Sequence, residues 1–328
     1  MPQQGRIIMS NTVKPRVIVS RCLGFDACRY NGQMLEDRRV EALKPFVEMI
    51  TVCPEADMGL GTPRQPVRLV RQDGEVLMLQ PSTGRDVTAE MQRYLDRQMA
   101  AGTDIDGFLL KGRSPSCGPS SVKIYHGVDK SASFSKGAGL YAEAVMRCHP
   151  YAAVEDEGRL RNFHIREAFL MRIFALARLR ALLMQPSLAD LVRFHASHKL
   201  LLMCYHQEMM RQCGRIASNG AHLPLQALVQ EYATVFRQAL CRQPGQRNII
   251  NALYHGYGWI SEGLTAAERK LFVDAIEEYR DDRLTLATLQ HLLKSYVLRF
   301  DHDYLGSQYF LDPYPRALFD LADSGHAA

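Results

Sequence analysis

The pattern of hydrophobic and polar positions changes character halfway along the 328-residue chain. In the first half, short apolar runs rich in β-branched residues alternate with stretches of helical period. This alternation is typical of a parallel sheet with helices on its faces. A hairpin over 69–79, turning at Asp73-Gly74, interrupts it. The pattern predicts strands at 16–20, 49–52, 106–110 and 151–154 and helices at 38–46, 88–101 and 140–148.

The second half has a helical period almost throughout. Gly214 is expected to end one helix, and Thr265 with Glu268 matches a capping box at the start of another. The expected helices cover 164–184, 188–213, 223–241, 248–259, 265–281 and 284–300. We therefore predict an α/β domain over 14–160, a parallel sheet with flanking helices, and an all-α domain over 161–315.

Composition limits the class of protein. Hydrophobic residues make up 47% of the chain and charged residues 23%, which is ordinary for a soluble globular protein and excludes a disordered one. No run reaches the roughly 18 apolar residues of a membrane-spanning helix, and the polar start of the chain lacks the apolar segment of a secretory signal. We expect a cytoplasmic protein with no membrane partner. In that reducing compartment, eight cysteines suggest metal binding or catalysis more than disulfides.

Positive charge is concentrated in the second half. The net charge of the chain is +5, yet residues 159–247 contain 13 Lys or Arg and only four Asp or Glu. Such a segment is either a polyanion-binding surface or a set of solvated helix faces.

Three cysteines occupy the same position relative to a predicted strand. Cys22, Cys53 and Cys117 each follow the end of one, and the carboxyl ends of parallel strands meet at one crevice. Three thiolates with one more ligand hold zinc, whereas an iron–sulfur cluster on three cysteines keeps one iron open. Cys28 is either a spare ligand or an ordinary loop or core cysteine, and the remaining cysteines are expected to be buried small hydrophobes.

Two polar residues accompany these thiols. Glu55, two residues after Cys53, is either a general acid or base or a turn residue. Ser114, three residues before Cys117, either hydrogen-bonds a substrate or forms the turn.

These residues stand in three sequence blocks. They are Val-Ser-Arg-Cys-Leu-Gly at 19–24, Val-Cys-Pro-Glu-Ala-Asp-Met-Gly-Leu-Gly-Thr-Pro-Arg at 52–64 and Leu-Leu-Lys-Gly-Arg-Ser-Pro-Ser-Cys-Gly at 109–118. In this order the blocks resemble the thiouracil desulfidase (TudS-type) domain family. The segment Phe-His-Ala-Ser-His-Lys-Leu-Leu-Leu-Met at 194–203 is similar to a helical domain of unknown function often fused behind it. This arrangement resembles the RudS-type proteins, which are associated with removing sulfur from 4-thiouridine in tRNA.

The resemblance implies a 4Fe–4S cluster held by Cys22, Cys53 and Cys117 with one iron free. It also implies that Glu55 is the catalytic acid or base and that the Ser114 hydroxyl polarises the substrate. The implied reaction is a non-redox desulfidation, in which 4-thiouridine in tRNA or a 4-thiouracil derivative becomes the uracil form and sulfide is released.

Further residues join this implied site. Lys111, Arg113 and Ser116 are expected to bind the substrate, and the two cations are suited to stabilising developing negative charge. Arg21 stands where a small residue is common in the family, so we expect it to contact a phosphate or narrow the pocket. The alternative functions are a desulfidase of free thiouracil or thio-UMP and a non-enzymatic iron–sulfur sensor.

The helical domain offers its own candidates. His195, His198 and His206 lie on or near one expected helix without Cys or carboxylate partners at metal spacing, which favours hydrogen-bonded histidines or phosphate contacts over a metal site. The aromatic stretch 254–259 either stacks on a splayed base or seals the helical core. Together with the basic segment, this makes tRNA the expected partner of the helical domain.

Overall fold

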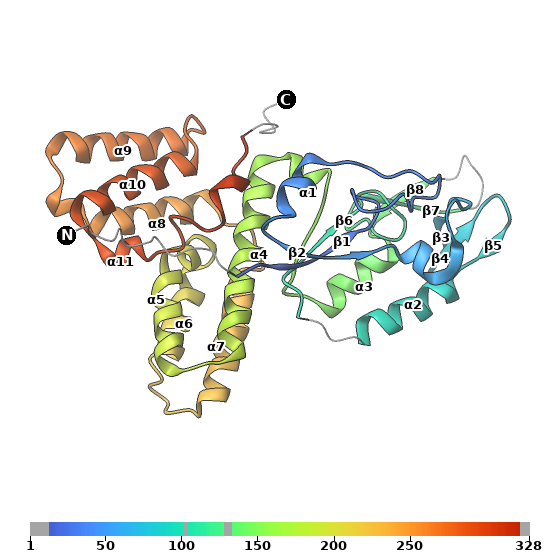
Figure 1. The fold of residues 1–328 in the computed structure, drawn as a ribbon, viewed down its shortest axis with the longest axis horizontal. Helices are drawn as coiled ribbons and strands as arrows, with labels where there is room; N and C mark the ends of the chain where they lie inside the picture. The colour runs from blue at the N-terminus through green and yellow to red at the C-terminus, as the bar shows by residue number, and fades with distance from the viewer. Residues whose placement is uncertain (1–12, 101–103, 128–132, 322–328) are drawn as a thin grey trace. The chain divides into compact units, whose positions relative to one another are not determined.

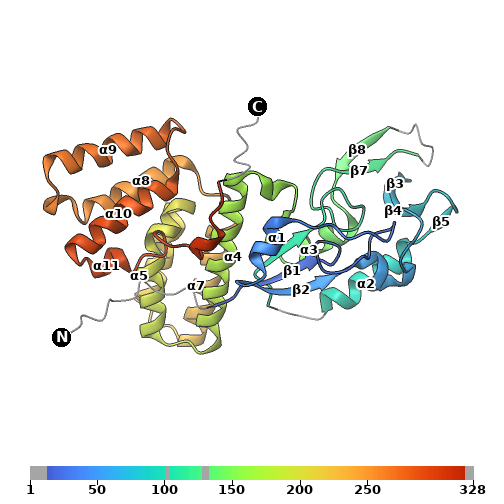
Figure 2. The same ribbon diagram turned by 45° about the horizontal axis from the view of Figure 1, so that its top comes forward.

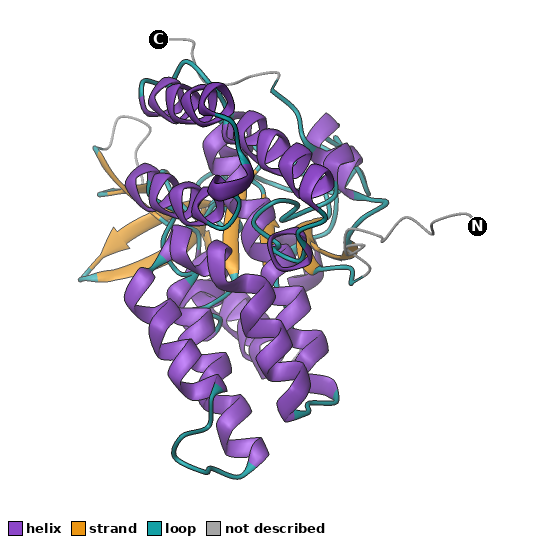
Figure 3. Ribbon diagram, turned by 90° about the vertical axis from the view of Figure 1, so that its left-hand side faces the viewer, coloured by secondary structure: helices purple, strands orange, loops and turns teal. Residues whose placement is uncertain are grey.

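The computed structural model describes residues 13–100, 104–127 and 133–321. These form two compact units, Lys14–Phe169 with residues 318–321, and Leu170–Ala317. All the strands of the described chain, which are orange in Figure 3, lie in the first unit. No helix of the described residues is long and apolar enough to cross a membrane.

A parallel sheet of four strands forms the centre of the first unit (Figure 1). Its strands are β1 (Arg16–Ser20), β2 (Glu48–Val52), β6 (Gly107–Leu110) and β9 (Ala153–Asp156). β1 pairs with β2 on one side and with β6 on the other, and β6 pairs with β9. The predicted α/β fold is thus confirmed, and the last strand begins two residues later than expected.

A second sheet of five short strands, in the order β5-β4-β3-β7-β8, completes the first unit. The strands are β3 (Arg68–Gln72), β4 (Glu75–Gln80), β5 (Arg85–Asp86), β7 (Val122–Tyr125) and β8 (Phe134–Gly137). The predicted hairpin is confirmed as β3 and β4. Both of its turn residues, Asp73 and Gly74, have positive φ, as a two-residue hairpin turn requires. The parallel pairing of β3 with β7 was not expected, because it joins segments far apart in sequence.

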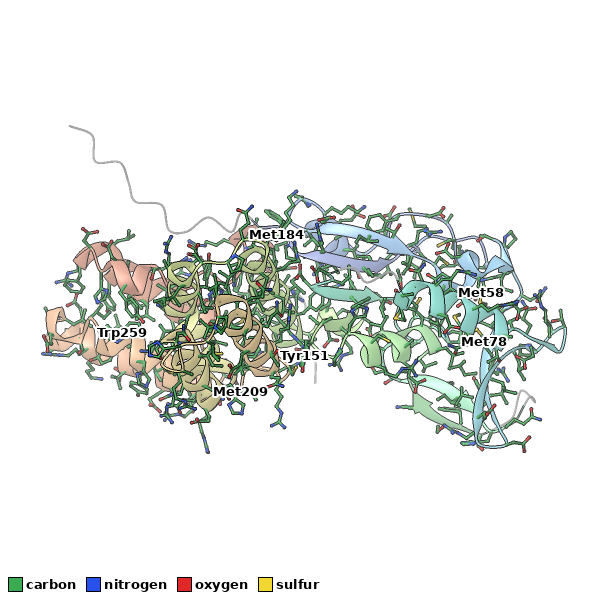
Figure 4. The ribbon with its side chains drawn as sticks, turned by 90° about the horizontal axis from the view of Figure 1, so that it is seen from below. Met58, Met78, Tyr151, Met184, Met209 and Trp259 are labelled. Carbon is green, nitrogen blue, oxygen red and sulfur yellow. The ribbon has the colours of Figure 1, made fainter. Side chains whose placement is uncertain are left out.

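Three helices cover the parallel sheet. They are α1 (Arg38–Leu43), α2 (Thr88–Ala100) and α3 (Leu140–Cys148). Figure 1 shows α2 and α3 together on one side and α1 on the other. Tyr94 of α2 and Tyr141 of α3 pack with Phe108 of β6 in one buried cluster. Met78 and Met58, labelled in Figure 4, join this cluster, which links both sheets to the two helices. Ala101 and Gly102, expected at the end of the second helix, lie outside the described residues.

The second unit is helical, as predicted. Its helices are α4 (Phe163–Met184), which begins in the first unit, α5 (Leu188–Tyr205), α6 (Gln207–Ala217), α7 (Leu225–Ala239), α8 (Gln246–Gly258), α9 (Ala266–Arg280), α10 (Leu286–Phe300) and α11 (Asp303–Gly306). α8, α9 and α10 pack against one another (Figure 2). The capping box predicted at Thr265 and Glu268 is present at the start of α9.

One predicted helix was wrong. The expected helix 188–213 is divided at His206, whose extended backbone separates α5 from α6 and whose ring accepts the Met209 N–H. Gly214 does not end a helix but lies inside α6. A side chain there would come within 3.1 Å of His195 Nε2, so the glycine permits close packing of α6 on α5. The apolar period continues through the break and therefore could not reveal it.

The three candidate histidines of the helical unit, His195, His198 and His206, are hydrogen-bonded, as predicted. His198 is buried, with Nδ1 2.8 Å from the Phe194 carbonyl oxygen, so Nε2 is free to accept the Arg178 Nε–H at 3.1 Å. Arg178 also donates to the Pro313 carbonyl at 3.0 Å and lies over the ring of Tyr309. Some of the basic side chains of residues 159–247, such as Arg178, therefore make interior contacts and do not contribute to a charged surface.

The aromatic stretch 254–259 also packs internally. Tyr257 stacks on Phe272, with ring centroids 5.0 Å apart, and Trp259 (Figure 4) contacts Tyr304 edge to face at 4.8 Å. These contacts agree with the alternative in which residues 254–259 seal the helical core.

Replacing Arg178 tests whether this interior network stabilises the helical unit. Arg178→Met removes the donor to His198 and Pro313 and is expected to lower the free energy of unfolding by about 2–5 kcal/mol, because two buried acceptors lose their partner. The measurement is urea denaturation followed by the fluorescence of Trp259, the single tryptophan of the chain. The control is Arg193→Met, whose side chain is 72% exposed and should change stability by no more than about 0.5 kcal/mol. Equal losses in the two variants would contradict the prediction.

Candidate functional site

Three loops at the carboxyl edge of the parallel sheet enclose one cavity of about 450 Å³. Cys22, Cys53 and Cys117, which follow β1, β2 and β6, all line it, as does Cys28. The predicted convergence of three thiols is therefore present, and a fourth thiol accompanies them. Cys28 is a close neighbour of Cys53, whose Sγ lies 3.6 Å from the Cys28 carbonyl oxygen.

All four of these cysteines are buried and none forms a disulfide. Burial raises the pKa of the Cys22 thiol to about 11, with a further contribution from nearby Cys53, and burial raises the pKa of Cys117 to about 12. Both thiols are therefore protonated at neutral pH until a cation replaces their protons. Buried thiols that gain their charge only from a bound cation suit a metal centre better than a free nucleophile.

The donor set fits an iron–sulfur cluster. In the part of the chain that the structure describes, no three His, Cys, Asp or Glu side chains converge tightly enough to hold a single metal ion. A cluster does not require such convergence, because each thiolate bonds a different iron atom. Three thiols around a cavity of this size, all of one soft type, match the ligands that iron–sulfur clusters take.

The loop that carries Cys117 is held by hydrogen bonds on two sides. Within it, Ser114 Oγ accepts the backbone N–H groups of Ser116 (3.3 Å) and Cys117 (3.1 Å). Outside it, backbone N–H groups at the start of α3 donate to the Ser116 carbonyl oxygen. Gly139 makes this approach possible, since a Cβ there would lie 2.4 Å from that oxygen. Ser114 is thus a turn-forming residue whose side chain also lines the cavity.

Glu55 lines the cavity, and both of its carboxylate oxygens accept hydrogen bonds. Ser116 donates its hydroxyl proton to Glu55 Oε1 at 2.6 Å, and Arg64 donates from two nitrogens to Oε2, at 2.9 Å from Nε and 2.8 Å from Nη2. Because Ser116 gives its proton to Glu55, Ser114 Oγ, 2.9 Å away, donates to Ser116. The result is a chain of hydrogen bonds from Ser114 through Ser116 to a buried carboxylate.

The predicted cations also line the cavity. Lys111 forms an ion pair with Glu157, and its backbone N–H donates to Ser20 Oγ at 2.8 Å, which connects the β6 loop to the end of β1. Arg113 has a left-handed backbone with φ 61° and an exposed side chain.

Arg21 does not line the thiol cavity. Its guanidinium forms an ion pair with Asp57, with Nη1 2.9 Å from Oδ1, and Asp57 in turn accepts the Cys53 N–H at 3.0 Å. Arg21 therefore supports the Cys53 loop and does not narrow the pocket, whereas its contact with a phosphate stays a prediction.

Sequence reasoning missed three residues of this site. Arg64 lies inside the second sequence block but carried no assigned role, Asp57 reads as a surface residue of a short helix, and Glu157 follows the last strand of the sheet. Glu157 could have been predicted at the site because it directly follows a parallel strand. The positions of Arg64 and Asp57 depend on how the loop after β2 folds back.

The buried pair of Arg64 and Glu55 makes a clear stability prediction. Their side chains are 5% and 10% exposed, so Arg64→Met leaves a buried carboxylate without its counter-charge and should cost about 3–5 kcal/mol of unfolding free energy. The control is Arg16→Met, which breaks an exposed pair with Glu48 and should cost about 0–1 kcal/mol. Urea denaturation followed by circular dichroism measures both, and similar losses would show that the buried pair adds no stability.

Comparison with known proteins finds a separate family match for each half of the chain. Residues 17–157 match the family model described as 2-thiouracil desulfurase, and residues 199–315 match a family of unknown function, DUF1722. The uncharacterized protein YbbK of Bacillus subtilis (strain 168) is 29% identical over 147 residues, which cover 43% of this chain and 95% of YbbK.

A solved structure, the [4Fe-4S]-dependent thiouracil desulfidase TudS, has 34% sequence identity and a TM-score of 0.37 over 45% of this chain and 93% of that one. The two family-model matches confirm the resemblance inferred from the three sequence blocks and from the helical segment. The chain combines a region of the 2-thiouracil desulfurase family with a region of the DUF1722 family.

Proposed function

We propose that this chain is a 4Fe–4S-dependent desulfidase that converts 4-thiouridine in tRNA to uridine and releases sulfide. The match of residues 17–157 to the 2-thiouracil desulfurase family supports an enzyme that acts on thionucleobases. The observation that carries the proposal is the meeting of three strand-end thiols and a buried carboxylate in one cavity. The [4Fe-4S] dependence of its relative TudS supports the cofactor. We assign the reaction to residues 14–160 and tRNA binding to residues 161–315.

We assign Cys22, Cys53 and Cys117 as the ligands of the cluster, because each follows a strand of the same sheet. When bound, a cluster held by three cysteines supplies an open iron, a soft Lewis acid that suits the soft sulfur of a thiocarbonyl. Cys28, also at the cavity, is proposed to stay outside this set.

The protein residues then carry out the proton transfers. Glu55 is proposed to take a proton from the water molecule that attacks the thiocarbonyl carbon, with Arg64 and Ser116 fixing its orientation. The carbon–sulfur bond breaks as the ring carbonyl forms, so one water and one thiocarbonyl give one carbonyl and one hydrogen sulfide, with no change of oxidation state. Lys111 and Arg113, which line the cavity, are suited to stabilising the negative charge that develops on the ring.

The proposal extends to the helical region. Residues 159–247 contain 13 Lys or Arg against four Asp or Glu. Arg166 and Arg178 are buried, and Arg193, Arg211 and Arg215 form exposed ion pairs, but the net positive charge of the segment supports binding of a polyanion. A base inside folded RNA must leave its stack to reach an enclosed cavity. A cytoplasmic location belongs to the same proposal, and the absence of disulfides among all eight cysteines supports a reducing compartment.

Nucleoside analysis of tRNA before and after anaerobic incubation with the reconstituted protein tests this function. We expect loss of 4-thiouridine, gain of uridine and release of an equal amount of sulfide. Each of Cys22→Ser, Cys53→Ser and Cys117→Ser should lose the visible absorption of the cluster and the activity together. The matched control is Cys28→Ser, which changes a thiol of the same cavity and should keep both.

Other outcomes identify the alternatives. Reaction of free 4-thiouracil or thio-UMP without reaction of tRNA would replace the proposal by a small-molecule desulfidase. An intact cluster with no desulfidation of any thiolated base would replace it by an iron–sulfur sensor. Loss of the cluster in Cys28→Ser would contradict the assigned ligand set.

The role of Glu55 is tested by Glu55→Gln. The amide retains the size of the side chain and an oxygen that can accept the Ser116 hydroxyl proton, but it cannot take a proton from water. We expect the turnover rate to fall by about 10²–10⁴-fold with cluster absorption unchanged. Glu48→Gln, which changes a carboxylate on the exposed side of β2, is the control and should retain full activity. A Glu55→Gln enzyme of normal rate would remove Glu55 from the chemistry.

A further inference from the structure

A second cavity of the first unit, of about 580 Å³, lies next to the thiol cavity and is lined by cations. We propose that it is a phosphate subsite, which binds phosphate groups of the substrate next to the reacting base. This inference rests on the proposed desulfidase function and places part of the nucleic-acid recognition in the α/β region, outside the helical one.

The two cavities share part of their walls. Pro66, Val67, Arg113 and Pro115 line both of them. A ligand whose base lies among the thiols can therefore extend its sugar and phosphate into the second cavity. Among the described residues that line this second cavity there are four cations, Arg68, Arg113, Lys123 and Lys136, and no carboxylate.

The cations form a row across three neighbouring strands of the second sheet. Lys123 of β7 stands directly opposite Lys136 of β8 in the antiparallel register. Leu69 of β3 pairs with Ile124 of β7 in the parallel register, so Arg68, one residue earlier, is level with Lys123. Since successive side chains point to opposite faces and Leu69 and Ile124 belong to the core, all three cations lie on the outer face.

The two opposed lysines of this row repel each other when no anion is present. Like charges directly opposite each other on paired strands destabilise a sheet. Neither Lys123 nor Lys136 forms an ion pair with an acidic side chain within the described part of the chain. A phosphate group placed between them would replace this repulsion by two charge-assisted hydrogen bonds.

Aromatic rings hold two of these cations in place. The guanidinium of Arg68 lies over the ring of Tyr125 at 4.1 Å, and the Lys123 ammonium lies over Phe134 at 4.4 Å from the ring centroid. Phe134 is 43% exposed, so part of its ring is accessible to a ligand in this cavity. Basic side chains interleaved with exposed aromatic rings are typical of surfaces that bind single-stranded nucleic acid.

The test compares phosphorylated with unphosphorylated ligands on the full-length reconstituted enzyme. The variant Lys123→Gln/Lys136→Gln should raise the KM for 4-thio-UMP, for 4-thiouridine RNA or for both by about tenfold or more, because each charge-assisted contact contributes about that factor. Its kcat, and its kinetics with free 4-thiouracil, should not change. The slope of the logarithm of RNA affinity against the logarithm of salt concentration should decrease in magnitude by about one for each phosphate contact removed. The control Arg93→Gln/Arg97→Gln removes the same charge from the exposed face of α2 and should leave every parameter unchanged.

The outcomes distinguish two sources of the phosphate group, and one measurement tests phosphate binding even if no desulfidation occurs. An effect on 4-thio-UMP assigns the cavity to the phosphate of the reacting nucleotide, and an effect on RNA alone assigns it to the flanking phosphodiesters. Calorimetric titration of UMP against uridine measures the same site without any desulfidation, with UMP binding weakened in the lysine variant. Unchanged UMP binding, together with unchanged KM values for both phosphorylated substrates, would overturn the inference even if desulfidation is observed.

Discussion

The parallel pairing of β1 with both β2 and β6 is the constraint on which the site depends. Three adjacent parallel strands end at the same edge, so the residues that follow them are brought together wherever they stand in the sequence. Cys22, Cys53 and Cys117 are separated by many residues along the chain and still line one cavity. Ser20 adds a direct connection, because its hydroxyl accepts the Lys111 N–H from the neighbouring loop.

Polar groups at this edge are buried, and each is provided with a partner. Glu55 has Arg64 and Ser116, and the carbonyl of Ser116 receives N–H groups from α3. A buried charge without such partners would cost several kcal/mol, so the pairs hold the carboxylate in one orientation beside the thiols. Burial raises the pKa of Cys22 and of Cys117, so metal binding by these thiols is coupled to proton release.

Charge is used differently in the two halves of the chain. In the helical unit, some cations are internal: Arg178 is buried against His198 and Tyr309, where it supports the packing. In the second sheet of the α/β unit, the lysines of β7 and β8 face outward beside the reaction cavity. A count of charges along the sequence pointed to the helical half, and the distribution in three dimensions adds a smaller basic surface next to the thiol cavity.

Local patterns in the sequence were enough to predict the α/β and all-helical halves, the hairpin at Asp73-Gly74, the capping box of α9 and the convergence of three cysteines. Each of these follows from residue periodicity, turn chemistry or the rule that parallel strands end at one edge. The break at His206, the second sheet, the Arg64–Glu55 pair and the opposition of Lys123 to Lys136 required the tertiary structure. They arise from contacts between segments distant in sequence, or from a helix boundary that the apolar period crosses without change, and no local propensity encodes such contacts.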